Sequence, residues 1–377
     1  MKEKRQLKVL AVFGTRPDAV KMAPVVEELR RFPDKIALSV AVSGQHREML
    51  DQVLDAFGIK PDYDLRIMRD KQSLESITSR CLEGLEDVFE EVCPEVVLAQ
   101  GDTTTTLVAA LAAFYHKAVF GHVEAGLRTD NKYNPFPEEM NRRLTTLLAD
   151  MHFAPTERAK RNLLAAGVRD EQIYVTGNTV IDALIAMTSR PFTFDDPWIE
   201  TAGRDRSRLI LVTAHRRENW GEPLKAICRA IVTILNRHPD VKVVFPVHKN
   251  PIVREIVFPA LQGVDRAHLI EPPDYVPFVH LMKLSYIILT DSGGVQEEAP
   301  SLGKPALVLR ETTERPEAVE AGCARLVGTN EQNIVAEVET LLSSRTQYER
   351  MAQVNNPYGD GTAARQIGEA IFSCFKL

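Results

Sequence analysis

Two carboxylates in the first half of the sequence follow short apolar segments and could take up or release a proton. Asp102 comes shortly after residues 96–99, and Glu124 comes directly after residues 118–123. Packing explains a carboxylate at the exit of a strand poorly, whereas general acid–base catalysis requires a positioned group of this kind. Both residues also have a structural interpretation, because Asp102 is a suitable N-cap for the segment after it and Arg128 could pair with Glu124.

A third carboxylate, Glu138, lies where a helix is expected to begin. Pro137 suits the first position of a helix, which places Glu138 in the first turn. Acidic side chains there interact favourably with the helix dipole, and Glu138 stands four residues before Arg142, a spacing that allows an ion pair. Glu138 is therefore either a structural residue or a third acid–base group.

Two motifs in the second half of the sequence could hold an anion. His215 and the two arginines after it follow residues 209–213, and the turn 292–294 (Ser-Gly-Gly) follows residues 287–290. Arginine side chains and the backbone N–H groups of such a turn both suit a diphosphate. Glu298, one turn further on, could accept the two hydroxyls of a ribose. A surface charge cluster is the alternative for the first motif, and a glycine-rich turn alone is weak evidence for the second.

A loop near the N-terminus could also hold an anion. Gly14-Thr15-Arg16-Pro17 follows residues 7–13, and Lys21 comes one turn later. Pro17 suits a first helical turn, and an anion is favoured at a helix N-terminus, so Arg16 and Lys21 are candidates to bind one. A surface loop with solvated charges is the alternative.

The elements that would position these residues alternate between strands and helices. Strands are expected at 7–13, 36–42, 96–99 and 118–123, then at 209–213, 241–246, 268–270, 287–290, 306–309 and 325–327, with helices such as 19–31, 47–57, 72–91, 103–115 and 179–189 between them. This alternation predicts an α/β protein with parallel sheets covered on both faces, in which ligands bind at the carboxyl ends of the strands.

The length and order of these elements predict two Rossmann-like domains. We place the first at residues 1–177 and the second at 178–361, and we expect a last helix, about 362–377, to pack back on the first domain.

The composition is that of a globular protein, and it excludes several classes of function. The 377 residues are 44% hydrophobic and carry a net charge of −6, which argues against nucleic acid as a partner. No apolar run has the length of a membrane span, no signal peptide is present, and the five cysteines form no CxxC pair. These features predict a cytoplasmic protein with reduced thiols and no membrane association.

Several common catalytic motifs are absent from the sequence. It contains no GxGxxG dinucleotide fingerprint, no GxxxxGK[ST] loop, no HExxH motif and no GxSxG elbow. We therefore expect no bound nicotinamide, phosphoryl transfer, serine hydrolysis or metal site, and no cofactor.

Taken together, the motifs resemble those of the non-hydrolysing UDP-N-acetylglucosamine 2-epimerases of bacteria. The matching segments, in order, are GTRPDAVKMAP at 14–24, QHREMLDQVL at 45–54, GDTTTT at 101–106, GHVEAGLRT at 121–129, FPEEMNR at 136–142, TGNTVIDAL at 176–184, HRREN at 215–219, DSGGVQEEAPSLGKP at 291–305, TTERPEA at 312–318 and NPYGDG at 356–361. The resemblance covers nearly the whole chain, and the shared order of many motifs makes it specific.

The resemblance implies a glycosyltransferase-B-like fold with the substrate cleft between the two domains. It implies a homodimer that interconverts UDP-GlcNAc and UDP-ManNAc to supply precursors of bacterial surface polysaccharides. The implied catalytic residues are Asp102, Glu124, Glu138 and His215. The implied substrate-binding residues are Arg16, Lys21, Arg142, Phe278, Ser292, Gly293, Gly294 and Glu298.

The chemistry of the reaction agrees with this residue set. Carbon 2 of the sugar is not next to a carbonyl, so its proton is not acidic, and the usual fingerprint for oxidation by NAD is absent. The remaining route is anti elimination of UDP to 2-acetamidoglucal, followed by re-addition with protonation on the opposite face. This route requires acid–base groups on two faces and stabilisation of departing UDP.

Some bacterial members of the family are activated by a second UDP-GlcNAc. Gln45, His46 and Gln72 match the positions associated with that effector, whereas Glu48 and Lys71 replace the Gln and Arg of certain members. Alternatives for the function are a hydrolysing epimerase, an epimerase of a UDP-diacetamido sugar, a glycosyltransferase and a regulator without catalysis.

Overall fold

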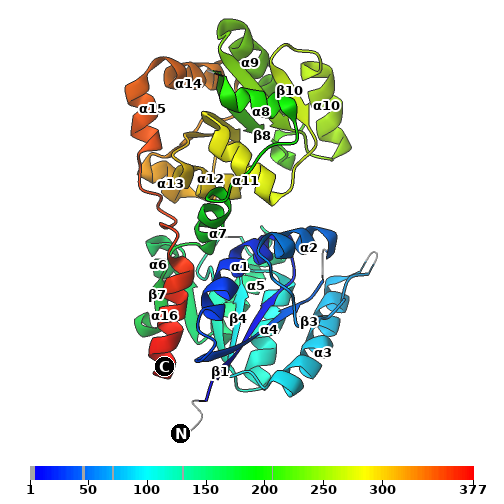
Figure 1. Cartoon of the computed structure of the whole chain (residues 1–377), viewed down its shortest axis with the longest axis vertical. Coiled ribbons are helices and arrows are strands. Elements are labelled where there is room, and N and C mark those ends of the chain that lie inside the picture. Colours follow the sequence, from blue (N-terminus) through cyan, green and yellow to red (C-terminus); the bar gives the residue numbers. More distant parts are fainter. Residues whose placement is uncertain (1–4, 45–46, 70–71, 130, 206) are drawn as a thin grey trace. The chain divides into compact units, whose positions relative to one another are not determined.

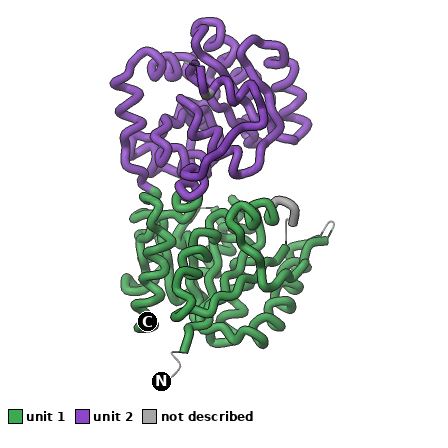
Figure 2. Tube along the Cα trace, in the orientation of Figure 1, with its two compact units in different colours: residues 1–183, 358–377 green, residues 184–357 purple. Residues whose placement is uncertain are grey.

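The computed structural model describes residues 5–44, 47–69, 72–129, 131–205 and 207–377. The chain forms two compact units, residues 1–183 with 358–377 and residues 184–357 (Figure 2). The chain passes from the first unit to the second within helix α7 (Thr179–Thr188) and returns just before Tyr358.

Unit 1 is built on a parallel sheet of seven strands in the order β3-β2-β1-β4-β5-β6-β7 (Figure 1). The strands are β1 (Leu7–Phe13), β2 (Ile36–Val42), β3 (Tyr63–Asp64), β4 (Val96–Gln100), β5 (Val119–Val123), β6 (Met151–Ala154) and β7 (Ile173–Val175). The order reverses at β1, whose neighbours are β2 and β4. The carboxyl ends next to such a reversal are where open α/β sheets place their ligands.

The helices of unit 1 connect these strands and end in the terminal helix. They are α1 (Arg16–Arg30), α2 (Arg47–Ala56), α3 (Leu74–Val92), α4 (Thr104–Tyr115), α5 (Glu138–Leu148), α6 (Glu157–Ala165), α7 and α16 (Ala363–Phe375). Helix α16 lies beside α1, and the Phe32 and Phe372 rings meet edge to face at 4.9 Å (Figure 1). The last residues of the chain thus belong to unit 1.

Unit 2 repeats the architecture with six parallel strands in the order β10-β9-β8-β11-β12-β13. Its strands are β8 (Arg208–Thr213), β9 (Val241–Pro246), β10 (Ala267–Ile270), β11 (Ile287–Thr290), β12 (Ala306–Val308) and β13 (Ala324–Leu326). Its helices are α8 (Pro197–Arg204), α9 (Glu222–Arg237), α10 (Pro251–Leu261), α11 (Tyr275–Leu284), α12 (Gly293–Glu298), α13 (Pro316–Ala321), α14 (Glu331–Ser343) and α15 (Arg345–Ala352).

The central strands are buried on both faces, which explains their continuous apolar sequences. Residues 9–12 of β1 and 209–212 of β8 are at most 2% exposed. Parallel strands covered by helices on both sides lack the alternation of half-exposed strands. Asp102, Glu124, His215 and Asp291 come just after strands of this kind, at their carboxyl ends.

The predicted fold class is confirmed, with two parallel α/β sheets. Strands β3, β6 and β7 were not predicted. Pro137 is the N-cap of α5 and not its first helical residue. Among the described residues, no helix is long and apolar enough to span a membrane.

Candidate active site

Glu124 lies at the carboxyl end of β5 in unit 1 and is held by donors from three other segments. Its Oε1 accepts a hydrogen bond from Lys21 Nζ at 2.5 Å and another from Asn178 Nδ2 at 2.8 Å, while Oε2 accepts one from Gln100 Nε2. The residue has a φ of +61°, a left-handed conformation that is uncommon for a side chain of this type. The backbone therefore turns at Glu124, and the carboxylate is only 7% exposed.

Lys21 is the ion-pair partner of Glu124, whereas the guanidinium of Arg128 donates to the Leu127 carbonyl and to Thr146 Oγ1. The structural interpretation in which Arg128 neutralises Glu124 is therefore not what the structure shows. Lys21 comes from the second turn of α1, so the first βα loop and the end of β5 meet at this carboxylate.

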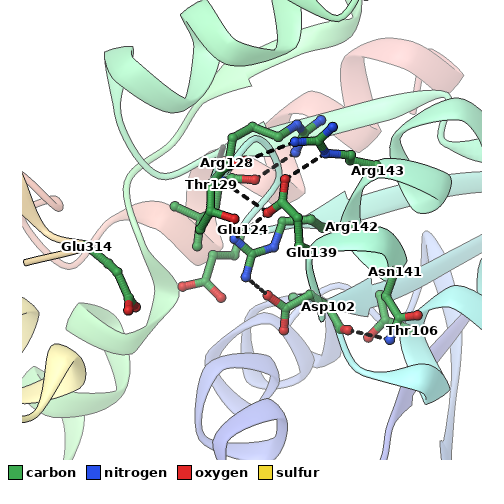
Figure 3. Close-up of polar contacts among 12 residues, drawn as sticks. Asp102, Thr106, Glu124, Arg128, Thr129, Glu139, Asn141, Arg142, Arg143 and Glu314 are labelled. Carbon is green, nitrogen blue, oxygen red and sulfur yellow. Dashed lines mark hydrogen bonds and ion pairs between the residues drawn. The ribbon is translucent and has the colours of Figure 1, made fainter. Parts of the chain in front are cut away.

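Asp102 lies at the end of the neighbouring strand β4 and pairs with Arg142 of α5 (Figure 3). Burial raises the pKa of Asp102, Arg142 opposes this shift, and Glu124 adds to it. The N-cap of α4 is Thr103, whose hydroxyl accepts from the Thr106 N–H, so the N-cap interpretation of Asp102 is wrong. A carboxyl whose pKa is raised by burial is suited to acid–base work.

Asn141 fixes the turn that carries Asp102. Its Nδ2 donates to the Asp102 carbonyl at 2.9 Å, and Gly101 has a φ of +76°, which suits glycine (Figure 3). His122 also holds this turn, because its Nε2 lies 2.7 Å from the Gly101 carbonyl oxygen. Burial lowers the pKa of His122 to about 3, so the ring is neutral and donates from Nε2.

Two adjacent glutamates at the start of α5 have different environments. Glu139 has no exposed surface and accepts from the Thr129 N–H at 3.0 Å and from Arg143 Nε at 2.6 Å (Figure 3). Glu138 is half-buried. The ion pairs of Arg142 go to Asp102 and Glu139, so the suggested pair between Glu138 and Arg142 is wrong. Glu139 is thus the structural member of the pair.

The first βα loop is organised by Asp18, which sequence reasoning did not single out. Its Oδ2 accepts from the Gly14 and Thr15 N–H groups at 3.3 and 3.2 Å and from Thr103 Oγ1 at 3.3 Å. Burial raises the pKa of this carboxyl to about 6. Arg16, two residues earlier, is exposed and available to a ligand.

In unit 2, His215 follows β8 and is anchored to Asp291, which follows the adjacent strand β11. Asp291 Oδ2 accepts from the His215 and Arg216 N–H groups, both at 2.8 Å, and from Asn219 Nδ2 at 3.0 Å. His215 Nδ1 lies 3.2 Å from Asp291 Oδ1. Burial lowers the pKa of His215, and Asp291 opposes this shift.

The turn at residues 292–294 begins α12 next to this anchor. Ser292 is the N-cap, and its N–H donates to Thr290 Oγ1 at 3.0 Å. A Cβ added to Gly293 would lie 3.8 Å from Arg216 Nη2, so that guanidinium lies close to the turn. Gly294 is exposed, and its Cβ position is open.

Glu298 is the last residue of α12, the helix that begins at this turn. It is 6% exposed, and Tyr275 Oη donates to its Oε1 at 3.3 Å. Burial, and then Glu298, raise the pKa of Tyr275 well above its ordinary value. Phe278 lies in the same helix, α11, one turn after Tyr275, and is half-buried.

The resemblance also implied an effector site at Gln45, His46 and Gln72. Gln45 and His46 lie outside the described residues, and Gln72 is half-buried just before α3. In the part of the chain that the structure describes, no group of three or more His, Cys, Asp or Glu side chains is placed to hold a metal ion.

The structure therefore brings Asp102, Glu124, Lys21 and Arg142 together in unit 1, and His215, Ser292 and Gly293 in unit 2. The first set consists of titratable groups next to buried charges, and the second of donors around a glycine turn. Titratable groups of the first kind suit proton transfer, and donors of the second kind suit an anion.

The chain matches the family model described as UDP-N-acetylglucosamine 2-epimerase over residues 27–372. A UDP-N-acetylglucosamine 2-epimerase of Bacillus subtilis is 54% identical, with 97% of this chain and 95% of that protein covered. The solved UDP-GlcNAc 2-epimerase of Neisseria meningitidis, bound to UDP-GlcNAc, is 51% identical with a TM-score of 0.86 over 97% of this chain and 100% of that one. A structure from Listeria monocytogenes is 50% identical with a TM-score of 0.94, covering 99% and 97% of the two chains.

The fold is glycosyltransferase-B-like, as in these structures. The chain belongs to the UDP-N-acetylglucosamine 2-epimerase family.

Proposed function

We propose that this protein is a non-hydrolysing epimerase that interconverts UDP-GlcNAc and UDP-ManNAc by anti elimination of UDP to 2-acetamidoglucal and re-addition. The observation that carries the proposal is the pair of carboxylates at the ends of adjacent strands, Glu124 after β5 and Asp102 after β4. Inversion at carbon 2 requires proton transfer on two faces of the sugar, which a single group cannot perform without moving.

Both carboxylates have a cation partner, because Glu124 pairs with Lys21 and Asp102 with Arg142. Burial nevertheless raises the pKa of Asp102, so it holds a proton more readily than an exposed carboxyl does. Two carboxyls at adjacent strand ends, one of them with a raised pKa, can act as base and acid in one cycle. Glu138, at the start of α5, is the third acid–base candidate.

We propose that unit 2 holds UDP and stabilises it as the leaving group. The turn at Ser292, Gly293 and Gly294 offers backbone N–H groups, Arg216 brings a guanidinium next to it, and Glu298 takes the ribose hydroxyls. His215, whose loop Asp291 fixes, faces the charge that develops on the diphosphate as the C1–O bond breaks. Arg16, Lys21 and Arg142 of unit 1 and Phe278 of unit 2 are the further substrate-binding residues that we propose.

The reaction is expected to need no cofactor, since the elimination moves protons and UDP without net oxidation. The test is to incubate UDP-GlcNAc with the purified full-length protein, without NAD and with EDTA, and to separate the products by anion-exchange chromatography. UDP-ManNAc in equilibrium with UDP-GlcNAc supports the proposal. Free ManNAc with stoichiometric UDP would identify a hydrolysing enzyme, and a requirement for an acceptor would identify a glycosyltransferase.

We also propose that the protein is a cytoplasmic homodimer that supplies surface-polysaccharide precursors. Exposed apolar side chains on the packed helices α4 and α5 support an interface: Phe114, Tyr115, Leu144 and Leu147 are 63%, 62%, 41% and 78% exposed. Such a patch is unusual on a monomer. Light scattering should give twice the chain mass, and Leu147→Glu should shift it toward the monomer. A wild-type monomer at micromolar concentration would contradict the proposal.

A further inference from the structure

Asn178 is a buried amide between β7 and α7 that contacts the candidate base directly. It is 2% exposed, and its Nδ2 donates to Glu124 Oε1 at 2.8 Å. Its Oδ1 accepts from the Val180 N–H at 3.2 Å. The second bond fixes the orientation of the amide, because the oxygen must face the helix and the NH₂ group must face Glu124. The side chain is thus a directed donor.

The backbone of the same residue lies where the chain leaves unit 1 and returns to it. The Asn178 N–H donates to the Tyr358 carbonyl at 2.6 Å. Gly177, with a φ of +86°, packs so closely that an added Cβ would lie 3.0 Å from that carbonyl oxygen. Tyr358 is the first residue of unit 1 after the return, and α7 carries the outgoing crossing. Asn178 therefore touches both crossings and Glu124 at once.

The other donors to Glu124 come from the sheet and from α1. Lys21 supplies a charge to Oε1, and Gln100 donates to Oε2. An ammonium attracts a carboxylate from a wide range of directions. The NH₂ group of an amide with a fixed plane donates only within a narrow range of directions. The two amides, Asn178 at Oε1 and Gln100 at Oε2, therefore set the direction of the carboxylate more than the ion pair does.

We propose that Asn178 is a positioning residue that aligns Glu124 for proton transfer at carbon 2 and ties this alignment to the two chain crossings. The inference rests on the proposed function, in which Glu124 exchanges a proton with the sugar. It assigns a role to a residue that does not itself act on the substrate.

Two substitutions test the role. Asn178→Ala removes the donor, and we expect kcat for epimerisation to fall by about 10- to 100-fold, less than the roughly 10²- to 10⁴-fold that an acid–base group contributes, because Glu124 itself remains. Since unit 2 is unchanged, the Kd for UDP, measured by calorimetry, should stay within about twofold of the wild-type value. Asn178→Asp keeps the shape and the acceptor for Val180 but places a second carboxyl against Glu124.

The pH profile of Asn178→Asp separates positioning from a general structural role. Ionised, the introduced carboxylate repels Glu124. Protonated, its O–H can donate to Glu124 as the amide did, so the ratio of its kcat to that of wild type should rise as the pH falls. Lys21, Asp102 and His122 also border this site, but wild type and variant share them, and their titration affects both profiles. The Asn178→Ala ratio should show no such rise toward acid pH, because alanine supplies no donor at any pH.

Asp182→Asn is the matched control. Asp182 fastens the same crossings through other atoms, accepting from the Ala363 and Ala364 N–H groups at 3.3 and 2.9 Å. We expect its kcat within about twofold of wild type, because Glu124 keeps its donors. If wild type makes UDP-ManNAc and folded Asn178→Ala keeps full kcat, or Asn178→Asp shows no acid-side recovery, the inference is overturned. If wild type makes no UDP-ManNAc, the proposed function itself fails.

Discussion

The two units use the same architecture, yet the groups at their strand ends are built for different tasks. In unit 1, Glu124 and Asp102 are bound by side chains, among them the cations Lys21 and Arg142. In unit 2, Asp291 is bound mainly by backbone N–H groups and serves to fix a loop. Under the proposed function, the titratable carboxylates beside cations in unit 1 suit proton transfer. The anchored loop of unit 2, with its arginine and its glycine turn, suits the holding of UDP.

The largest effect expected is that of Glu124→Gln. The amide keeps the shape but cannot take a proton, so kcat should fall by about 10³-fold, within the range that positioned acid–base groups contribute. The Kd for UDP should be unchanged, because the expected UDP contacts are mainly in unit 2. A variant that loses UDP binding but keeps kcat would reverse the assignment of the two units.

A smaller effect, in the opposite unit, is expected for Asp291→Ala. The substitution leaves the His215 and Arg216 N–H groups and the Asn219 amide without their acceptor, and each such loss costs about 1–3 kcal/mol. We expect the Kd for UDP to rise by about 10- to 100-fold and the melting temperature of the protein to fall. Unchanged UDP affinity in a folded variant would remove the proposed role of this anchor.

The sequence was sufficient to predict the fold class, because continuous apolar strands alternate with helices along the chain. It was also sufficient to find Asp102 and Glu124, since strand exits are visible as ends of apolar runs. It did not show their partners. Asn178 and Gln100 meet Glu124 from distant points in the chain, and only the pairing of β4 with β5 and the return at Tyr358 bring them together.

Local pattern also misled in two places. Asp102 precedes a helix and has the composition of an N-cap, but Thr103 takes that position, which leaves the carboxylate to Arg142. Glu138 and Glu139 are adjacent and chemically identical, and the structure distinguishes them by burial and by the ion pairs of Glu139. The spacing of Glu139 to both Arg142 and Arg143 was the available signal for its structural role.

Asp18 gives a stability prediction that depends on pH. Its pKa in the folded protein is raised from 3.8 to about 6 by burial, so the folded state binds the proton more tightly than the unfolded chain. Its contribution to the unfolding free energy is therefore greatest below about pH 4 and is lost as the pH rises through 6, with a loss of at most about 3 kcal/mol.

The variant Asp18→Asn isolates this contribution from that of Asp182, whose pKa is also raised to about 6. An amide oxygen can still accept from the Gly14 and Thr15 N–H groups. The variant should melt at a higher temperature than wild type at pH 8, and the difference should shrink toward pH 4. A difference that grows toward low pH would show that the charged form stabilises the loop.

The smallest effect is expected for Tyr275→Phe in unit 2. The substitution removes one hydrogen bond of 3.3 Å to Glu298. A single bond to a charged acceptor is worth about 1.5–3 kcal/mol at good geometry, and less at this distance, so UDP affinity should fall by only a few fold with kcat little changed. A kcat loss as large as that of Glu124→Gln would place proton chemistry in unit 2 as well.

The most direct test of the central claim follows the hydrogen at carbon 2. UDP-GlcNAc is incubated with the protein in deuterated water, and the first UDP-ManNAc formed is examined by proton NMR. Because the carboxylates of unit 1 are proposed to exchange protons with solvent during the cycle, the product should carry deuterium at carbon 2 while UDP remains attached at equilibrium. UDP-ManNAc that retains the original hydrogen at carbon 2 would contradict the elimination route and the acid–base role of unit 1.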